Sequence, residues 1–249
     1  IPTTAGTGSE VTPISIVTTG ATTKMGVVAP ILYADVAILD ATFTQGLPAH
    51  ITAATGIDAM VHAIEAYTSN VKKNFYADML AQNALKLLNH NLTKVLKNGA
   101  DLEARQNMLV GSMLAGQAFA NAPVAAVHAL AYPLGGHFHL SHGHTNALVL
   151  IEVLKFNAPK AKQHYAELMQ LLDPRSTGCT DGLCDLFIDH MQNHLDQSGL
   201  TLKLKDLDIP EAKLPQLAKD AMLQTRLLQN NPREMTEQDA LQIYQAIYA

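Results

Sequence analysis

The feature that most constrains the fold is the helical spacing of apolar residues, which begins at Pro48 and continues to the C-terminus. Between Phe75 and Leu92, large apolar residues recur every three or four positions, and the sequence NGAD ends this pattern near Asn98. Such spacing places the apolar side chains on one face of an α-helix. Turn signals such as DPRSTG separate further segments of the same kind. The patterns predict helices over residues 48–69, 75–98, 102–120, 162–172, 182–195 and 236–249.

The first 45 residues have a different character. The segments 10–19 and 24–40 are rich in Val, Ile and Thr and are bounded by Gly and Pro, which is typical of strands. The sequence TTAGTGS, which precedes them, consists of small residues and indicates a loop. We therefore expect a mainly α protein, in which a short strand-rich segment (residues 1–46) precedes an all-helical domain (residues 47–249).

Composition and charge argue against two classes of partner. The formal net charge is −5 and no basic run stands out, so we expect no nucleic-acid partner. No apolar run reaches the length of a membrane span, so we expect no membrane partner.

Cys179 and Cys184 are too few for a disulfide framework and lack the spacing of a zinc knuckle. They predict two free thiols in a reducing cytoplasm.

Five of the eleven histidines lie in one mostly apolar stretch, HALAYPLGGHFHLSHGHTNA. His128 follows a small apolar segment that is typical of a helix start. His142 precedes Gly143, as a metal ligand on a turn would. In a segment with so few charges, imidazole side chains either bind a metal ion or make hydrogen bonds in the core.

Upstream of this stretch, Asp58 and His62 are four residues apart in a predicted helix, which puts both side chains on one face. The residues around the pair are apolar, and burying a carboxylate without a cation is costly. With His128 and His142, the pair offers three imidazoles and one carboxylate, a set that suits Fe(II), Zn(II) or another divalent transition metal. We interpret these four residues as a metal site. The other interpretation is a set of surface or hydrogen-bonded core histidines.

Four stretches of the sequence resemble a known family. They are PTTAGTGSEVT, AILDATFTQGLPAHITAATGIDAMVHAIEAY, VHALAYPLGGHFHLSHGHTNAL and NPREMT. The second matches the family signature, with Asp40, Pro48, Asp58 and Glu65 at the expected spacings. Over essentially its whole length, the chain resembles the iron-containing, or group III, alcohol dehydrogenases.

The resemblance implies that Asp58, His62, His128 and His142 are the four ligands of one metal ion, Fe(II) or alternatively Zn(II). The fourteen-residue step from the third ligand to the fourth is that of the family. The other three histidines of the stretch are not family ligands. They line the substrate cleft or lie in solvated loops, and we expect His144 in a loop.

The family also carries an N-terminal dinucleotide-binding domain of Rossmann-like type. Residues 1–46 would be the C-terminal remnant of that domain, and we expect a preceding part to be missing from this chain. By resemblance, the cofactor is NAD or NADP, and Thr3, Thr4, Thr7 and Lys24 contact it. Hydroxyl groups and small residues allow close approach to phosphate or ribose.

The activity that the resemblance implies is hydride transfer between NAD(P) and a small alcohol or aldehyde, with the substrate oxygen on the metal ion. Many relatives carry a second His four residues after the third ligand, where this chain has Tyr132. We take Tyr132 as the candidate catalytic residue for the proton relay. Relatives are commonly dimers or larger, so we expect a homo-oligomer. Two alternatives stay open, namely a metal-binding helical fragment that is inactive without its dinucleotide domain and a zinc enzyme similar to glycerol dehydrogenase.

Overall fold

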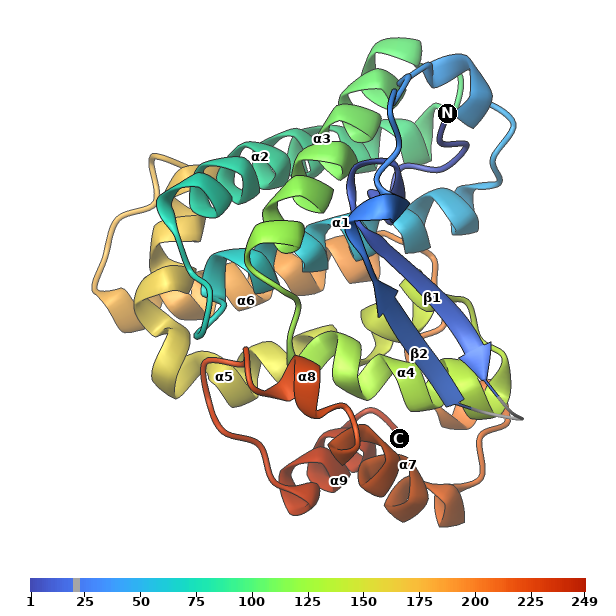
Figure 1. Ribbon diagram of the computed structural model, residues 1–249. Coiled ribbons are helices and arrows are strands. Elements are labelled where there is room, and N and C mark those ends of the chain that lie inside the picture. The colour runs from blue at the N-terminus through green and yellow to red at the C-terminus, as the bar shows by residue number, and fades with distance from the viewer. Residues whose placement is uncertain (20–22) are drawn as a thin grey trace.

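Long α-helices make up most of the molecule, and one antiparallel hairpin near the N-terminus lies beside them (Figure 1). The computed structural model describes the backbone of residues 1–19 and 23–249, and the side chains outside residues 18–24. The α-helices are α1 (Ala49–Thr68), α2 (Phe75–Lys97), α3 (Leu102–Asn121), α4 (Ala126–Phe138), α5 (His142–Leu172), α6 (Thr180–Asp196), α7 (Leu214–Met222), α8 (Thr225–Leu228) and α9 (Glu237–Ala246). Short 3₁₀ turns join them at η1 (Ser9–Val11), η2 (Pro30–Leu32), η3 (Ala41–Thr44), η4 (Lys205–Leu207) and η5 (Glu211–Lys213). The mainly α architecture that the sequence predicts is confirmed.

The central element is α1, which packs against α2, α3 and α5. All of its residues from Gly56 to Thr68 are buried. A helix that is buried on every face lies inside a domain, covered by its neighbours. The helices α2 and α3 pack along each other, as do α5 and α6. Asp58 and His62, on α1, are therefore enclosed by other helices.

Side-chain caps fix several helix boundaries close to where the sequence predicts them. Asn74 Oδ1 accepts a hydrogen bond from the Ala77 N–H at 2.9 Å and so begins α2. Asp101 begins α3 in the same way. Thr236 and Asp239 form a reciprocal capping box at the start of α9. These side chains satisfy backbone N–H groups that have no partner within the helix.

The region around His142 differs from the prediction. His142 is the first residue of α5, a helix of 31 residues, and does not lie on a turn. The predicted helix over residues 162–172 is only the C-terminal part of α5. Gly143 allows the start of α5 to pack closely against α1, because a Cβ atom at this position would lie 2.2 Å from the carbonyl oxygen of Ala54 on α1. A glycine that reads as a turn signal therefore lets two helices approach.

The hairpin pairs β1 (Ile14–Thr19) with β2 (Thr23–Val28), with Ile14 opposite Val28. The first strand confirms the prediction, although it begins later than residue 10. The second predicted strand, 24–40, is too long, because Pro30 begins the 3₁₀ turn η2 soon after Val28. Proline has no N–H to donate to a ladder, so it ends the pairing.

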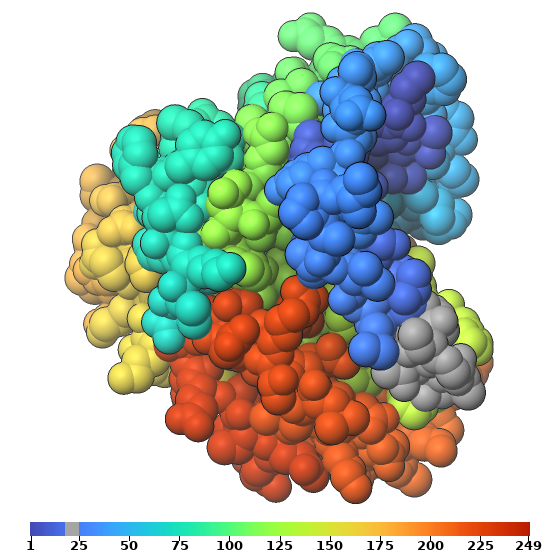
Figure 2. Space-filling view, viewed as in Figure 1, coloured from blue at the N-terminus to red at the C-terminus, as the bar shows by residue number. Residues whose placement is uncertain are grey.

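The loop before the hairpin is pressed against two helices. A Cβ atom at Gly6 would lie 2.7 Å from the Thr55 Cβ of α1. Gly8 has a φ of 58° and lies against Gly116 of α3. Because only glycine allows both contacts, the loop reaches the helical layer. In the space-filling view, the blue hairpin region lies beside the orange and red C-terminal region (Figure 2).

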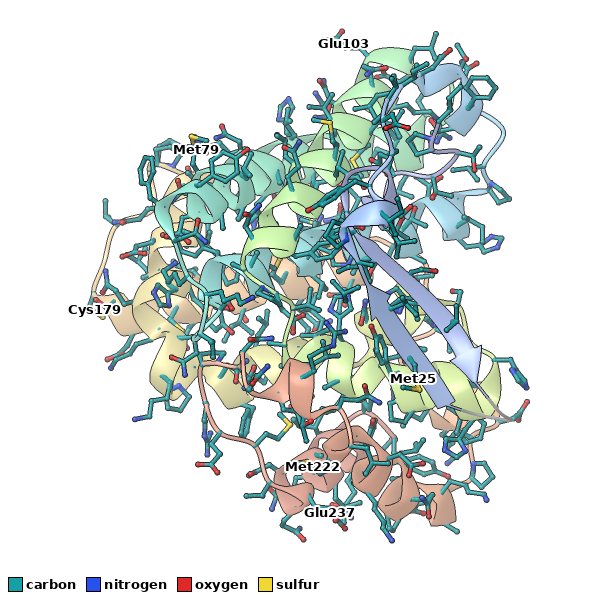
Figure 3. All side chains as sticks on the ribbon, in the orientation of Figure 1. Met25, Met79, Glu103, Cys179, Met222 and Glu237 are labelled. Carbon is teal, nitrogen blue, oxygen red and sulfur yellow. The ribbon has the colours of Figure 1, made fainter. Side chains whose placement is uncertain are left out.

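Two findings bear on the expectations about membrane-spanning segments and disulfides. No single helix within the described residues is long and apolar enough to cross a membrane, and α3 with α4 meets the length and composition criteria only as a pair bent by 106°. Both cysteines are free, as predicted, with Cys184 buried and Cys179 exposed. Cys179 lies on the opposite side of the molecule from Met25 of the hairpin (Figure 3).

Candidate metal centre

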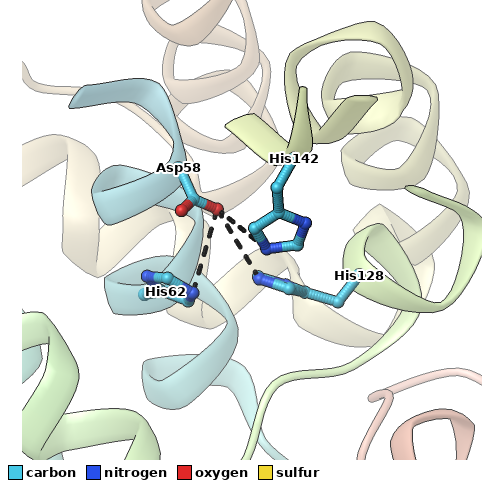
Figure 4. Close-up of side chains that lie close together, drawn as sticks. All are labelled: Asp58, His62, His128 and His142. Atoms are coloured by element: carbon cyan, nitrogen blue, oxygen red, sulfur yellow. Dashed lines mark ion pairs between the residues drawn. The ribbon is translucent and has the colours of Figure 1, made fainter. Parts of the chain in front are cut away.

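Four side chains from three helices converge on one point (Figure 4). Asp58 and His62 come from α1, His128 from the first turn of α4, and His142 from the start of α5. Asp58 Oδ1 lies 3.8 Å from His62 Nε2, 3.7 Å from His128 Nε2 and 3.5 Å from His142 Nε2. One ligand atom from each residue lies within 4.8 Å of the others. The four side chains would therefore be able to hold one metal ion between them.

Burial and ring packing hold this group in place. Asp58, His62 and His128 are each less than 5% exposed, whereas His142 is partly exposed. The His62 ring stacks between Phe119 of α3, at 4.4 Å between ring centroids, and His128, at 4.8 Å. The centre is therefore enclosed on the α1 side and open to its surroundings at His142.

The buried surroundings shift the pKa values of two of the four side chains, Asp58 and His62. Burial alone would raise the pKa of Asp58, but the charges of the three histidines and a hydrogen bond from Asn146 hold it below its usual value. Burial lowers the pKa of His62 to about 3. At neutral pH the centre thus holds an ionised carboxylate and a neutral imidazole, which are the ligating forms of both groups.

Two of the imidazoles are oriented by acceptors behind them. His62 Nδ1 lies 3.3 Å from the Gly6 carbonyl oxygen, which can only accept, so we assign the ring proton to Nδ1. His128 Nδ1 lies 2.7 Å from Glu65 Oε2, and the other Glu65 oxygen accepts from the Val127 N–H at 2.7 Å. In both rings, Nε2 then presents its lone pair to the shared point. Partners of this kind fix the tautomer of metal-binding histidines.

Glu65 contacts a candidate ligand, and the sequence alone assigned it no role in the site. It is 4% exposed, and its two oxygens accept from the backbone and the ring of the α4 start. A signal was present, because Glu65 follows Asp58 by seven residues, two helical turns along the same face of α1. Its partner, however, lies 63 residues away in the sequence, so spacing could not reveal the contact.

The donor set fits a divalent transition metal. Three imidazole nitrogens and one carboxylate oxygen converge, and the carboxylate is buried without a lysine or arginine paired to it among the described residues. A cation would offset the cost of burying that charge. Mixed nitrogen and oxygen donors of intermediate softness suit Fe(II) and Zn(II).

The centre opens into a cleft of about 520 Å³. Its lining includes three of the four residues, His62, His128 and His142, together with Tyr132. Burial raises the pKa of Tyr132 to about 12, although the positive charge of Arg226 acts in the opposite direction. The Tyr132 hydroxyl is therefore protonated at neutral pH and can donate a hydrogen bond into the cleft.

The charged groups that line the cleft are positive. Lys72 and Arg226 are among the lining residues, and no Asp or Glu is found there among the described residues. The lining also includes apolar side chains, such as Ile16 and Phe119, and uncharged polar ones, such as Gln229. A cleft of this kind suits a ligand that carries both apolar surface and negative charge.

The predicted cofactor residues fall into three groups. Thr7 lines the cleft together with the metal-binding histidines. Thr3 and Thr4 lie in the same loop and are not among the lining residues that the structure describes. Lys24 pairs with Thr18 through its backbone in β2, and its side chain lies outside the described part of the chain.

The remaining histidines of the stretch lie outside the centre. His137 contacts Asp220 at 2.7 Å, and His139 ends α4 with a φ of 56°. The expectation that His144 lies in a loop is wrong, because it belongs to the first turn of α5 and donates to the Thr201 carbonyl oxygen at 2.6 Å. The histidine-rich stretch therefore holds two candidate metal ligands, and its other three histidines lie outside the centre.

Comparison with known proteins matches both parts of the chain. Residues 52–248 match the model of the Fe-containing alcohol dehydrogenase family, C-terminal part. Residues 1–41 match the model named iron-containing alcohol dehydrogenase. The chain is 43% identical over its whole length to long-chain-alcohol dehydrogenase 1 of Geobacillus thermodenitrificans and covers 63% of that protein. It is 35% identical to 1,3-propanediol dehydrogenase of Klebsiella pneumoniae, of which it covers 64%.

A solved structure agrees with these matches. The crystal structure of a 1,3-propanediol oxidoreductase superposes with a TM-score of 0.94 at 35% identity, over 99% of this chain and 64% of that one. The chain thus spans a little under two thirds of the length of these relatives. By the family match over most of its length and by its fold, the chain belongs to the iron-containing alcohol dehydrogenase family.

Proposed function

We propose that the protein is a metal-dependent alcohol dehydrogenase, which transfers a hydride between NAD or NADP and a small alcohol or aldehyde. The observation that carries this proposal is the convergence of one carboxylate and three imidazoles at the edge of a cleft. The relatives support it, because their names describe dehydrogenases of a long-chain alcohol and of 1,3-propanediol.

Asp58, His62, His128 and His142 would hold the ion, with Fe(II) proposed first and Zn(II) second. When bound, the ion supplies a Lewis acid, which lowers the pKa of an alcohol hydroxyl and polarises a carbonyl group. One carboxylate among three neutral imidazoles leaves a net positive charge on a divalent ion and its ligands. Glu65 and the Gly6 carbonyl hold the Nδ1 protons and so keep two Nε2 atoms available.

Tyr132 is the proposed proton-handling residue of the cleft. Its ring lies 5.9 Å from the His142 ring, between centroids. As a protonated phenol it would orient the substrate oxygen or pass a proton, and it would not act as the initial base.

We propose that the dinucleotide binds on the side of the cleft that residues 1–46 form. Residues 47–249 would then be the metal-binding domain. The position of Thr7 in the cleft lining supports a contact of this residue with the dinucleotide. Thr3, Thr4 and Lys24 remain proposed contacts, and the positive charges of Lys72 and Arg226 suit an anionic dinucleotide. A homo-oligomer in the cytoplasm stays a prediction.

The test is an assay of the protein after anaerobic loading with Fe(II), in which 1-propanol oxidation is followed by the absorbance of NADH or NADPH. We expect turnover in the unmodified protein and its loss in Asp58→Ala. His144→Gln is the matched control, because it changes a histidine of α5 outside the centre. Equal turnover in Asp58→Ala would refute the proposed site. If the protein binds metal but shows no turnover with either NAD or NADP, the result would favour the alternative of a metal-binding fragment without activity of its own.

A further inference from the structure

Asn146 is buried among the four candidate ligands and has no role in the function proposed so far. It lies on α5, one turn after His142, and is 0% exposed. Its Nδ2 atom lies 2.5 Å from Asp58 Oδ1, 3.2 Å from His128 Nε2 and 3.4 Å from His142 Nε2. One side chain thus contacts three of the four candidate ligands.

The orientation of the amide follows from its neighbours. The Asp58 carboxylate can only accept hydrogen bonds. His128 Nε2 also presents a lone pair, because the ring proton is held at Nδ1 by Glu65. An amide oxygen 2.5 Å from the Asp58 carboxylate and 3.2 Å from His128 Nε2 would be repelled by both, so the NH₂ group faces them.

The same orientation leaves the other end of the amide unsatisfied. Asn146 Oδ1 is buried and has no hydrogen-bond partner among the described residues. An unsatisfied buried acceptor destabilises the folded state. An apolar residue of similar shape would avoid that cost but would remove the donor from Asp58, whose other named partners are the three imidazoles.

We propose that Asn146 is a positioning residue of the metal centre, which holds the Asp58 carboxylate in the orientation that faces the three imidazoles. This inference rests on the proposed metal site. A carboxylate oxygen has more than one lone pair, so it can accept from Asn146 and bind an ion at the same time. Hydrogen bonds to ligating carboxylates of this kind raise metal affinity about 10- to 100-fold.

The test compares Asn146→Leu with the unmodified protein, using Zn(II) affinity by chelator competition and the visible absorption spectrum of the Co(II)-loaded chain. We expect a loss of affinity of about 10- to 100-fold and a shift of the Co(II) bands, because Asp58 is no longer held. Asn146→Ser keeps a donor, the shorter hydroxyl group, and should lose less affinity for Zn(II). This variant replaces Asn146→Leu in the test if the Leu variant fails to fold.

The matched control is Asn157→Leu. Asn157 is also buried on α5, but it pairs with Asn231 at 2.9 Å, outside the centre. This variant should lower the melting temperature and leave both the Zn(II) affinity and the Co(II) spectrum unchanged. An Asn146→Leu protein with the original affinity and spectrum would overturn the inference while leaving the metal site intact. An unmodified chain that binds neither ion would overturn both the site and the inference.

Discussion

At the residue scale, the partner of an imidazole decides what the ring can do. His128 donates from Nδ1 to Glu65, so its Nε2 faces the candidate metal centre. His144 sits two residues after a candidate ligand, yet it donates to a backbone carbonyl and faces elsewhere. The residue type alone does not separate these cases, whereas the acceptor behind the ring does.

Glu65→Gln tests this effect directly. A glutamine has one acceptor oxygen in place of two, so either the Val127 N–H or the His128 ring loses its acceptor. We expect the affinity for Zn(II), measured by chelator competition, to fall about 10- to 100-fold. Glu167→Gln is the matched control, because Glu167 accepts from Tyr67, a contact outside the centre. Unchanged affinity in Glu65→Gln would contradict the role of Glu65.

His194 predicts a pH dependence of stability. Burial lowers the pKa of His194 to about 4, and the charge of His190 acts in the same direction. The unfolded chain binds this proton near pH 6.5, so the contribution is present above pH 6.5 and is lost as the pH falls from there toward about 4. Between pH 7 and pH 5, we expect a loss of about 1–2 kcal/mol from this side chain.

The measurement is urea unfolding at pH 7 and pH 5 for the unmodified chain and for His194→Gln. Other histidines with lowered pKa values, such as His62, contribute equally to both proteins. The variant should therefore lose less stability on acidification. The same loss in both proteins would show that His194 does not account for it.

The sequence reveals the candidate ligands but not the residues that support them. Asp58 and His62 share a helix face, which spacing alone predicts, and the histidine-rich stretch adds His128 and His142 as candidates, which the family resemblance supports. Glu65 and Asn146 act through contacts between helices that are 62–88 residues apart in the chain. Local patterns carry no information on such contacts, because they depend on how α1, α4 and α5 pack.

At the scale of elements, helices were predictable where periodicity and caps agree, as in α2, α3 and α9. The start of α5 was not, because His142, Gly143 and His144 have neither a regular apolar pattern nor strong helix propensity. Packing decides this segment. The missing side chain of Gly143 allows the first turn of α5 to lie against α1, which brings His142 to Asp58.

Gly143→Ala tests that packing. The added Cβ would lie 2.2 Å from the Ala54 carbonyl oxygen, which is backbone and cannot rotate away. We expect a loss of stability of about 1–3 kcal/mol and weaker metal binding, because α5 must move from α1. Urea unfolding and Zn(II) titration measure the two effects.

Gly182→Ala is the matched control, since its added Cβ would meet only Cys179 Sγ at 3.6 Å. That change in helix α6 should stabilise the chain by about 0.5–1 kcal/mol, because alanine loses less backbone freedom than glycine. If both variants behaved alike, the close approach of α5 to α1 would not control the geometry of the centre.

At the scale of the whole molecule, an ion would join three helices that are far apart in the sequence. A ligand that binds only the folded state stabilises it, by about 2.7 kcal/mol when its concentration is one hundred times its Kd. We therefore expect a strong chelator to lower the melting temperature of the metal-loaded chain. Asp58→Ala should melt at the same temperature with and without chelator, and a chelator effect that persisted in this variant would place the bound metal elsewhere.

The measurement that tests the account most directly is the metal content of the purified chain beside Asp58→Ala and His142→Ala, with His144→Gln as control. After anaerobic reconstitution with Fe(II), we predict close to one ion per chain in the unmodified protein and in the control, and none in the other two variants. An unmodified chain without metal, or an Asp58→Ala variant that keeps its ion, would contradict the proposed centre.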